Sequence, residues 1–196
     1  GRGIYGALLF LPWVFSNIMA VTVWKWFFND TYGVINYYIQ LMGLPGVQWL
    51  SKPNMAMVTV IVLNIWKGYP FSMVLLLAGL QNIPHELGEA ARIDGAGRLG
   101  VLRYVTLPLL APVMAANIVL ITIYTFNVFD LVYAMTGGGP VNATEIIGLF
   151  MYRQAFTSGR LGYGSAVAVL MFLLNLLITI VYLSTIARRS FRSESA

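Results

Sequence analysis

Long apolar segments constrain the fold of this chain more than any other feature of its sequence. A helix needs about 20 mainly apolar residues to cross a bilayer. Four segments meet this length, at roughly 4–28, 55–80, 111–135 and 165–186. Because backbone N–H and C=O groups cannot stay unpaired in hydrocarbon, helices are the expected spanning form. The sequence therefore predicts an all-α integral membrane protein, in which residues 1–196 form a single transmembrane domain built as a helix bundle.

The composition supports a membrane protein and excludes several other classes. Of the 196 residues, 59% are hydrophobic and 10% are charged, whereas about a quarter of a soluble domain is charged. The net charge of +5 comes from residues that lie mostly between apolar segments. That placement fits membrane topology and argues against a nucleic-acid partner. The lack of cysteine and the single histidine, His85, exclude thiolate chemistry and a histidine metal cluster.

Basic residues predict the orientation of the chain. The positive-inside rule assigns arginine-rich flanks to the cytoplasm. Seven arginines precede the first span, separate the second from the third, or follow the fourth: Arg2, Arg92, Arg98, Arg103, Arg188, Arg189 and Arg192. Both ends and the loop between the second and third spans are therefore expected inside, and segments 29–53 and 136–163 outside. The abrupt start at Gly1, without a methionine, predicts an N-terminally incomplete domain.

The two outward segments carry turn signals at Gly43–Gly46 and Gly137–Pro140. In the first of them, Val34–Met42 is predicted to form a short helix along the membrane interface. Aromatic residues often gather at the headgroups, and four tryptophans near span ends are expected there: Trp13, Trp24, Trp26 and Trp49.

The loop between the second and third spans, residues 83–108, has too regular a pattern for a plain linker. Pro84 suits the start of a helix, and Gly95 allows a sharp turn. A second short helix is predicted over 98–105, and Pro108 is expected to end it and lead into the third span. The pattern predicts two short helices, joined by a glycine turn, that project into the cytoplasm.

The first of these helices offers a surface that another protein can approach. Ala90 and Ala91 provide a face of small side chains, and Glu89, Arg92 and Asp94 provide charged groups beside it. The same features also suit a loop that packs on its own membrane domain. The residues alone leave docking and internal packing equally open.

This loop resembles the EAA motif of ABC importer permeases, whose pattern is E-A-A-x3-G-x9-I-x-L-P. The chain has Glu89-Ala90-Ala91, then Gly95, Val105 and Leu107-Pro108, and Val105 in place of isoleucine is the one departure. The resemblance implies a coupling helix that sits in a groove of an ATP-binding subunit. It implies that Glu89 contacts that subunit and that Gly95 makes the turn.

Two further stretches are similar to the maltose-type, carbohydrate-uptake group of these permeases: Thr136–Pro140 and Phe10–Trp13. The resemblance implies a multi-pass permease in the bacterial cytoplasmic membrane that moves a sugar. It implies as partners a second homologous permease subunit, two ATP-binding cassette subunits and an extracytoplasmic solute-binding protein. ATP and Mg²⁺ would be bound by the partner subunits, and no cofactor by this chain.

Polar residues in the middle of the second span form a candidate substrate surface. Asn64, Lys67, Gly68 and Phe71 share one helix face through i, i+3, i+4, i+7 spacing. A lysine at a lone helix centre costs about 2.5–3.5 kcal/mol on insertion scales, so Lys67 should face a watery cavity or a partner. Spacing leaves two alternatives open, in which the face binds substrate or Lys67 pairs with Asp130. The resemblance favours substrate for Asn64 and Gly68, while the maltose permease lacks a lysine at the Lys67 position.

The third span is polar on two faces, and the resemblance implies that Tyr124 and Thr125 contact the sugar. The fourth span has few polar groups and is predicted to pack against other helices or lipid.

Three functions are compatible with a membrane protein of this size, and the residues favour one of them. A permease without catalysis of its own fits the absence of a glycine-rich GK[ST] loop, since ATP would be hydrolysed elsewhere. A membrane-embedded enzyme would need a catalytic set, and one histidine with scattered carboxylates argues against it. A passive channel would not need the docking loop. For a permease, the open substrates are a disaccharide, a monosaccharide and glycerol 3-phosphate.

Overall fold

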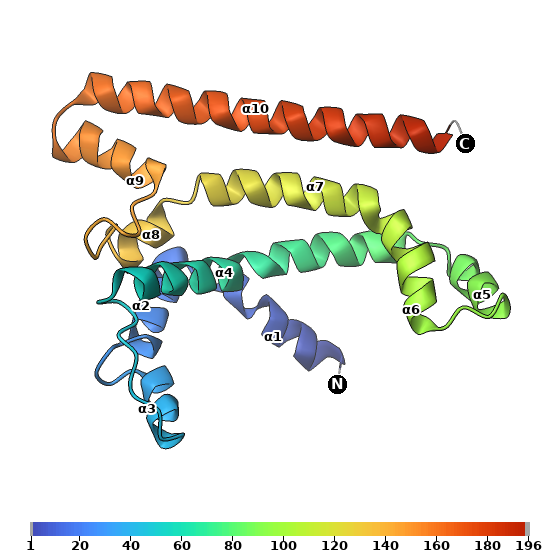
Figure 1. The fold of residues 1–196 in the computed structure, drawn as a ribbon, viewed down its shortest axis with the longest axis horizontal. Coiled ribbons are helices and arrows are strands. Elements are labelled where there is room, and N and C mark those ends of the chain that lie inside the picture. Colours follow the sequence, from blue (N-terminus) through green and yellow to red (C-terminus); the bar gives the residue numbers. More distant parts are fainter. Residues whose placement is uncertain (1, 195–196) are drawn as a thin grey trace. The chain divides into compact units, whose positions relative to one another are not determined.

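The computed structural model describes residues 2–194, and within this range the side chains of all but residues 2–4, 7, 183 and 185–194. Helices are the regular secondary structure of the described range (Figure 1). The α-helices are α1 (Arg2–Val14), α2 (Asn17–Phe27), α3 (Val34–Leu41), α4 (Pro53–Gln81), α5 (His85–Ile93), α6 (Arg98–Val101), α7 (Leu107–Phe126), α8 (Asp130–Met135), α9 (Ile147–Tyr152) and α10 (Leu161–Glu194). Two π-helical turns, η1 (Leu102–Thr106) and η2 (Arg153–Thr157), follow α6 and α9. The all-α fold predicted from the apolar segments is confirmed.

The chain forms two compact units, each assembled from segments far apart in the sequence. Unit 1 comprises Gly1–Pro70 and Thr125–Asn175, and unit 2 comprises Phe71–Tyr124 and Leu176–Ala196. The long helices α4 and α10 each contribute residues to both units.

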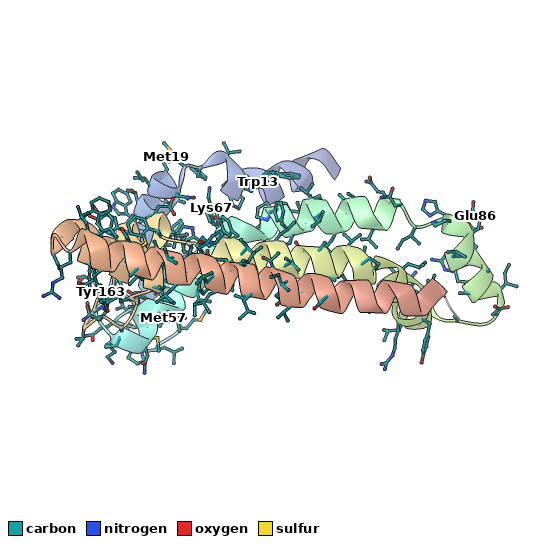
Figure 2. The ribbon with its side chains drawn as sticks, turned by 90° about the horizontal axis from the view of Figure 1, so that it is seen from above. Trp13, Met19, Met57, Lys67, Glu86 and Tyr163 are labelled. Atoms are coloured by element: carbon teal, nitrogen blue, oxygen red, sulfur yellow. The ribbon has the colours of Figure 1, made fainter. Side chains whose placement is uncertain are left out.

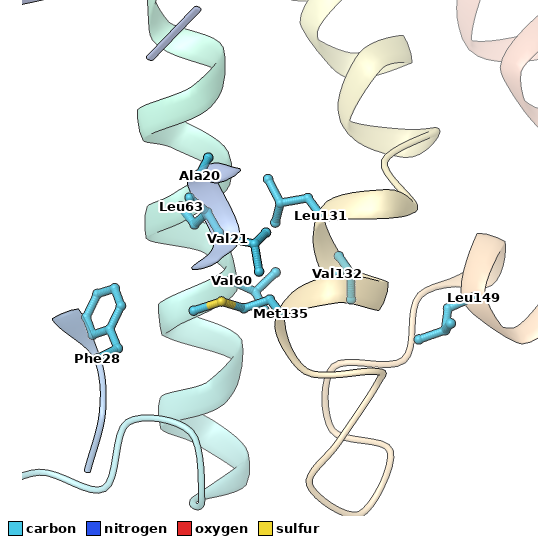
Figure 3. Close-up of a cluster of buried hydrophobic side chains, with 9 residues drawn as sticks. All are labelled: Ala20, Val21, Phe28, Val60, Leu63, Leu131, Val132, Met135 and Leu149. Atoms are coloured by element: carbon cyan, nitrogen blue, oxygen red, sulfur yellow. The ribbon is translucent and has the colours of Figure 1, made fainter. Parts of the chain in front are cut away.

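The core of unit 1 lies where α2, α4 and α8 meet. Its fully buried members include Leu63, Leu131 and Leu149 (Figure 3). They are joined by the remaining members of the cluster, Ala20, Val21, Phe28, Val60, Val132 and Met135. Lipid tails are as apolar as leucine, so close packing, and not removal of these side chains from water, favours this contact within a membrane.

The first predicted span is wrong as a single helix, because the chain breaks after α1. The axes of Leu8–Val14 and Asn17–Phe27 differ by 115°. Ser16 has an extended backbone and its hydroxyl accepts a hydrogen bond from the Met19 N–H at 3.2 Å. This N-cap satisfies one of the free donors of α2 and starts a new helix at that point.

The second and fourth predicted spans correspond to α4 and α10. The described residues contain three helices that are long and apolar enough to cross a membrane, or four if the bent α1–α2 pair counts as one span. Helix α4 runs through Pro70 without interruption in its helical assignment.

The third predicted span has different bounds from those expected over 111–135. A single helical stretch runs from Arg98 to Phe126, and the chain then forms the separate short helix α8 after a three-residue link. The expected break at Pro108 does not occur. The π-helical turn η1 immediately precedes it, and such a wider turn relieves the clash between a proline ring and the preceding carbonyls.

The outward segment after α2 is held by a buried asparagine. The helix predicted at Val34–Met42 is present as α3. Asn36, 1% exposed, bonds the backbone at Asp30 and Val47 and accepts from the Trp49 ring N–H at 3.0 Å. Trp24 and Trp49 pack against the core of unit 1, whereas Trp26 is 72% exposed.

Candidate functional site

In the loop over residues 83–108, the first short helix and the glycine turn are present in unit 2 as predicted. The second helix begins at Arg98 as expected, but it is not short, because it continues to Phe126. Gly95 has φ +88°, and the Ala96 N–H donates to the Ala91 carbonyl at 2.9 Å while the Gly95 N–H donates to the Arg92 carbonyl at 3.1 Å. This is the Schellman pattern that ends a helix with a residue in the left-handed region. Gly97 then precedes α6 with an ordinary φ of −69°.

Exposed apolar side chains flank this turn. Ile93 is 86% exposed, Leu99 81% and Tyr104 76%. The predicted contact residues lie on the same short segment: Glu89, Ala90, Arg92, Asp94 and Gly95 are exposed or half-buried, as is Ala91.

A hollow of about 230 Å³ lies between α5 and the start of the following helix. Glu89 and Arg92 line it from α5, and Val101 and Val105 line it from the other side. From Arg98 onward the backbone stays helical to Phe126. A force applied at the turn is therefore transmitted along a stiff helix, and not absorbed by a flexible loop.

Of the polar face predicted on α4, Asn64 and Gly68 lie in unit 1. The Asn64 side-chain oxygen is buried and has no hydrogen-bond partner among the described residues. A Cβ atom added at Gly68 would meet nothing within 4 Å. A buried polar atom without a partner needs an explanation, and a missing ligand or a group from another chain supplies one.

The contacts of Lys67 are ones that the sequence did not predict. Its side chain is 8% exposed, and its ammonium donates to the Pro12 carbonyl at 2.7 Å and to the Phe15 carbonyl. The alternative of a Lys67–Asp130 ion pair is wrong, since Asp130 accepts a hydrogen bond from the Asn17 amide instead. Figure 2 shows the side chains of Lys67, on α4, and Trp13, near the end of α1.

The other candidate substrate residues fall in different units. Phe71, 37% exposed, and Tyr124, 47% exposed, belong to unit 2. Thr125 belongs to unit 1 and is exposed. Unit 1 thus holds Asn64, Lys67, Gly68 and Thr125 of the predicted substrate residues.

Two polar clusters of unit 1 have no counterpart among the sequence predictions. Asn127 and Asn175 exchange side-chain hydrogen bonds at 3.3 and 3.4 Å. Arg153 forms an ion pair with Glu145 at 2.5 Å and donates to the Asn142 side chain. The members of each pair lie on different elements or in the links between them, so spacing along one helix gave no signal for them.

A comparison with protein families gives a match over almost the entire chain. Residues 2–189 match the family described as binding-protein-dependent transport system inner membrane component.

Characterised relatives are similar over most of this chain. It is 42% identical over 183 residues to the trehalose/maltose transport system permease protein MalF of Thermococcus litoralis, a match that covers 93% of this chain and 62% of that protein. It is 39% identical over 178 residues to the sulfoquinovosyl glycerol transport system permease protein SmoG of Agrobacterium fabrum, covering 91% of this chain and 58% of that one. The chain therefore spans about three-fifths of the length of these relatives.

The fold also matches a solved structure. A bacterial ABC transporter involved in the import of the acidic polysaccharide alginate superposes with a TM-score of 0.87 over 95% of this chain and 66% of the other. The sequence identity is 24%, so this likeness supports the fold alone.

Proposed function

This chain belongs to the family of binding-protein-dependent transport system inner membrane components, and on that basis we propose that it is the membrane-spanning permease subunit of an ATP-driven importer for a sugar. It is a multi-pass protein of the cytoplasmic membrane, as the sequence predicted. Its proposed partners are a second homologous permease, two ATP-binding cassette subunits that bind ATP and Mg²⁺, and an extracytoplasmic solute-binding protein.

One observation carries the coupling role, namely the exposed helix–glycine–helix segment that continues into a spanning helix. Glu89, Arg92 and Asp94 offer charges to a partner, and Ile93 and Leu99 offer apolar area on both sides of the turn. Exposed apolar area rimmed by charge is the usual composition of a protein interface. We assign this surface to the ATP-binding subunit.

The substrate class follows from the relatives and from the polar face of α4. The two relatives, MalF and SmoG, transport trehalose or maltose and sulfoquinovosyl glycerol, according to their names. The open space beside Gly68 suits a sugar ring, and Asn64, one helical turn before it, carries a buried oxygen whose acceptor capacity is unused within the described residues. Glycerol 3-phosphate is less well supported, because the Lys67 ammonium is already hydrogen-bonded to carbonyl groups within the chain.

The proposed mechanism is alternating access. Closure of the ATP-binding subunits displaces the docked segment around Gly95. Because the helix from Arg98 to Phe126 is continuous, that displacement tilts the span and closes one side of the substrate path while the other side opens.

Two matched glycine variants test the coupling role. In Gly95→Ala, a side chain is forced into the left-handed region, which costs about 1–2 kcal/mol. In Gly97→Ala the backbone has an ordinary φ, and neither site has an atom within 4 Å of the added Cβ. In the complete transporter in proteoliposomes, Gly95→Ala is expected to lower substrate-stimulated ATP hydrolysis and uptake by roughly fivefold or more. Gly97→Ala is expected to retain both.

Copurification of the ATP-binding subunit is the second measurement. Glu89→Ala is expected to reduce the amount that copurifies, as well as uptake. Normal coupling in both Gly95→Ala and Glu89→Ala would contradict a docking role for this segment.

A further inference from the structure

The break between α1 and α2 leaves backbone carbonyl groups without hydrogen-bond partners inside a helix. The last carbonyl groups of a helix lack intrahelical partners, and within a bilayer an unpaired backbone group costs several kcal/mol. Helix α1 ends at Val14 and α2 begins at Asn17. The carbonyls near this end, including those of Pro12 and Phe15, therefore need donors from elsewhere.

Lys67 supplies such donors from the middle of α4. Its ammonium donates to the carbonyls of Pro12 and Phe15. The positive charge also lies at the C-terminal, negative end of the α1 dipole, where a cation is favoured. One side chain thus satisfies two carbonyls and complements the charge of the helix end.

Neighbouring contacts fasten the same region. The Tyr69 hydroxyl, two residues along α4, donates to the Leu9 carbonyl at 2.8 Å. On the other side of the break, the Asn17 amide donates to Asp130 at the start of α8. Both arms of the broken span are therefore tied to their surroundings within unit 1.

We propose that Lys67 is a positioning residue of the transporter, which fixes the broken α1–α2 span against α4 and so sets the shape of the polar face that includes Asn64 and Gly68. It does not bind the substrate itself. This inference rests on the proposed function, because the polar face is assigned to substrate there. Lys67 adjoins Gly68 and lies one helical turn beyond Asn64. A shift of α1 relative to Lys67 would therefore change the space next to both residues.

Burial distinguishes this role from substrate binding. The side chain is 8% exposed, and an ammonium has three donors, two of which are used by carbonyls of the break. The third donor remains, but a side chain that is 8% exposed offers it little access to a substrate.

Distance measurements across the break test the proposal. The chain has no cysteine, so spin labels can be introduced at Tyr5→Cys on α1 and Ile18→Cys on α2, which are 70% and 71% exposed. In the complete transporter, built from cysteine-free partner subunits, Lys67→Met is expected to shift or broaden the distance distribution. Lys67→Arg keeps a cation with several donors, and is expected to retain a narrow distribution and most of the uptake. Lys25→Met, at the end of α2, is the control for loss of a lysine and is expected to change neither.

Uptake of two different sugars separates positioning from binding. Lys67→Met is expected to lower the maximal rate roughly tenfold, the effect of removing a hydrogen-bonding charge. The ratio of the two KM values should stay within about twofold. An unchanged distance distribution would overturn the proposal, as would a KM increase confined to one sugar.

If Lys67→Met does not assemble, Lys67→Gln replaces it in the distance measurement. The glutamine amide keeps polar N–H donors, which favours assembly, but the side chain is uncharged and too short to reach both carbonyls, so a shifted or broadened distribution is still expected. A distribution as narrow as in the wild type would then overturn the proposal. If the wild-type complex moves neither sugar, the proposed function fails, while the distance measurement still decides the role of Lys67.

Discussion

Gly68 is the residue at which the candidate substrate face can be altered with least disturbance to the fold. It lies inside α4, where glycine is a weak helix former, and the space beside it is empty. A methyl group there has nothing within the chain to collide with. Any effect on transport would then arise from a molecule that uses this space.

We expect Gly68→Ala to change stability and transport in opposite directions. Replacing glycine by alanine in a helix interior stabilises it by up to about 1 kcal/mol, so unfolding in detergent should not become easier. Uptake in proteoliposomes should fall, with a higher KM, because the methyl group narrows the substrate path. Gly6→Ala is the matched control, since it also lies within a helix and also faces open space. Equal uptake by the two variants would remove Gly68 from the substrate face.

The contrast between Gly95 and Lys67 shows which residue roles the sequence reveals. Gly95 belongs to a local pattern of fixed spacing, so its turn was predictable from the sequence alone, and its φ is indeed left-handed. The partners of Lys67 lie 52 and 55 residues away and are backbone carbonyls. Every residue has a backbone carbonyl, so residue types do not show which carbonyl will accept a hydrogen bond. The need for a partner was therefore predictable, but its identity was not.

Helix ends were harder to predict than helices. Apolar length predicted α4 to within two residues at each end, and its prediction of 165–186 lies within α10, because hydropathy is a sum over many residues. The breaks after Val14 and Phe126 interrupt stretches that remain apolar on both sides. At the break after Val14 lie a local cap, made by Ser16, and a hydrogen bond from Asn17 to Asp130, which is 113 residues further along the chain. A sum over a window of about 20 residues cannot register them.

The cap at Ser16 should contribute measurably to the stability of the broken span. Ser16→Ala removes the acceptor of the Met19 N–H, and loss of a helix N-cap costs about 1 kcal/mol. Thermal unfolding of the purified transporter in detergent is expected to occur at a lower temperature. Ser184→Ala, within α10, is the control, because its hydroxyl bonds the carbonyl of Val181 on its own helix and its removal should change stability by less than about 0.5 kcal/mol. Equal unfolding temperatures for both variants would show that the break does not depend on Ser16.

For the chain as a whole, the distribution of arginines predicts which loops face the cytoplasm. The arginines around the loop between α4 and α7 place that loop in the cytoplasm by the positive-inside rule, and the segment after α8 then lies outside. Leu99 and Val141 are 81% and 90% exposed in these two segments.

Because the chain has no cysteine, Leu99→Cys and Val141→Cys each introduce one reactive thiol. In intact cells, a membrane-impermeant maleimide is expected to label Val141→Cys, and to label Leu99→Cys only after the cells are opened. Both proteins should be labelled equally in detergent, which controls for reactivity. Labelling of Leu99→Cys from outside would invert the orientation and remove the segment around Gly95 from the reach of any ATP-hydrolysing partner.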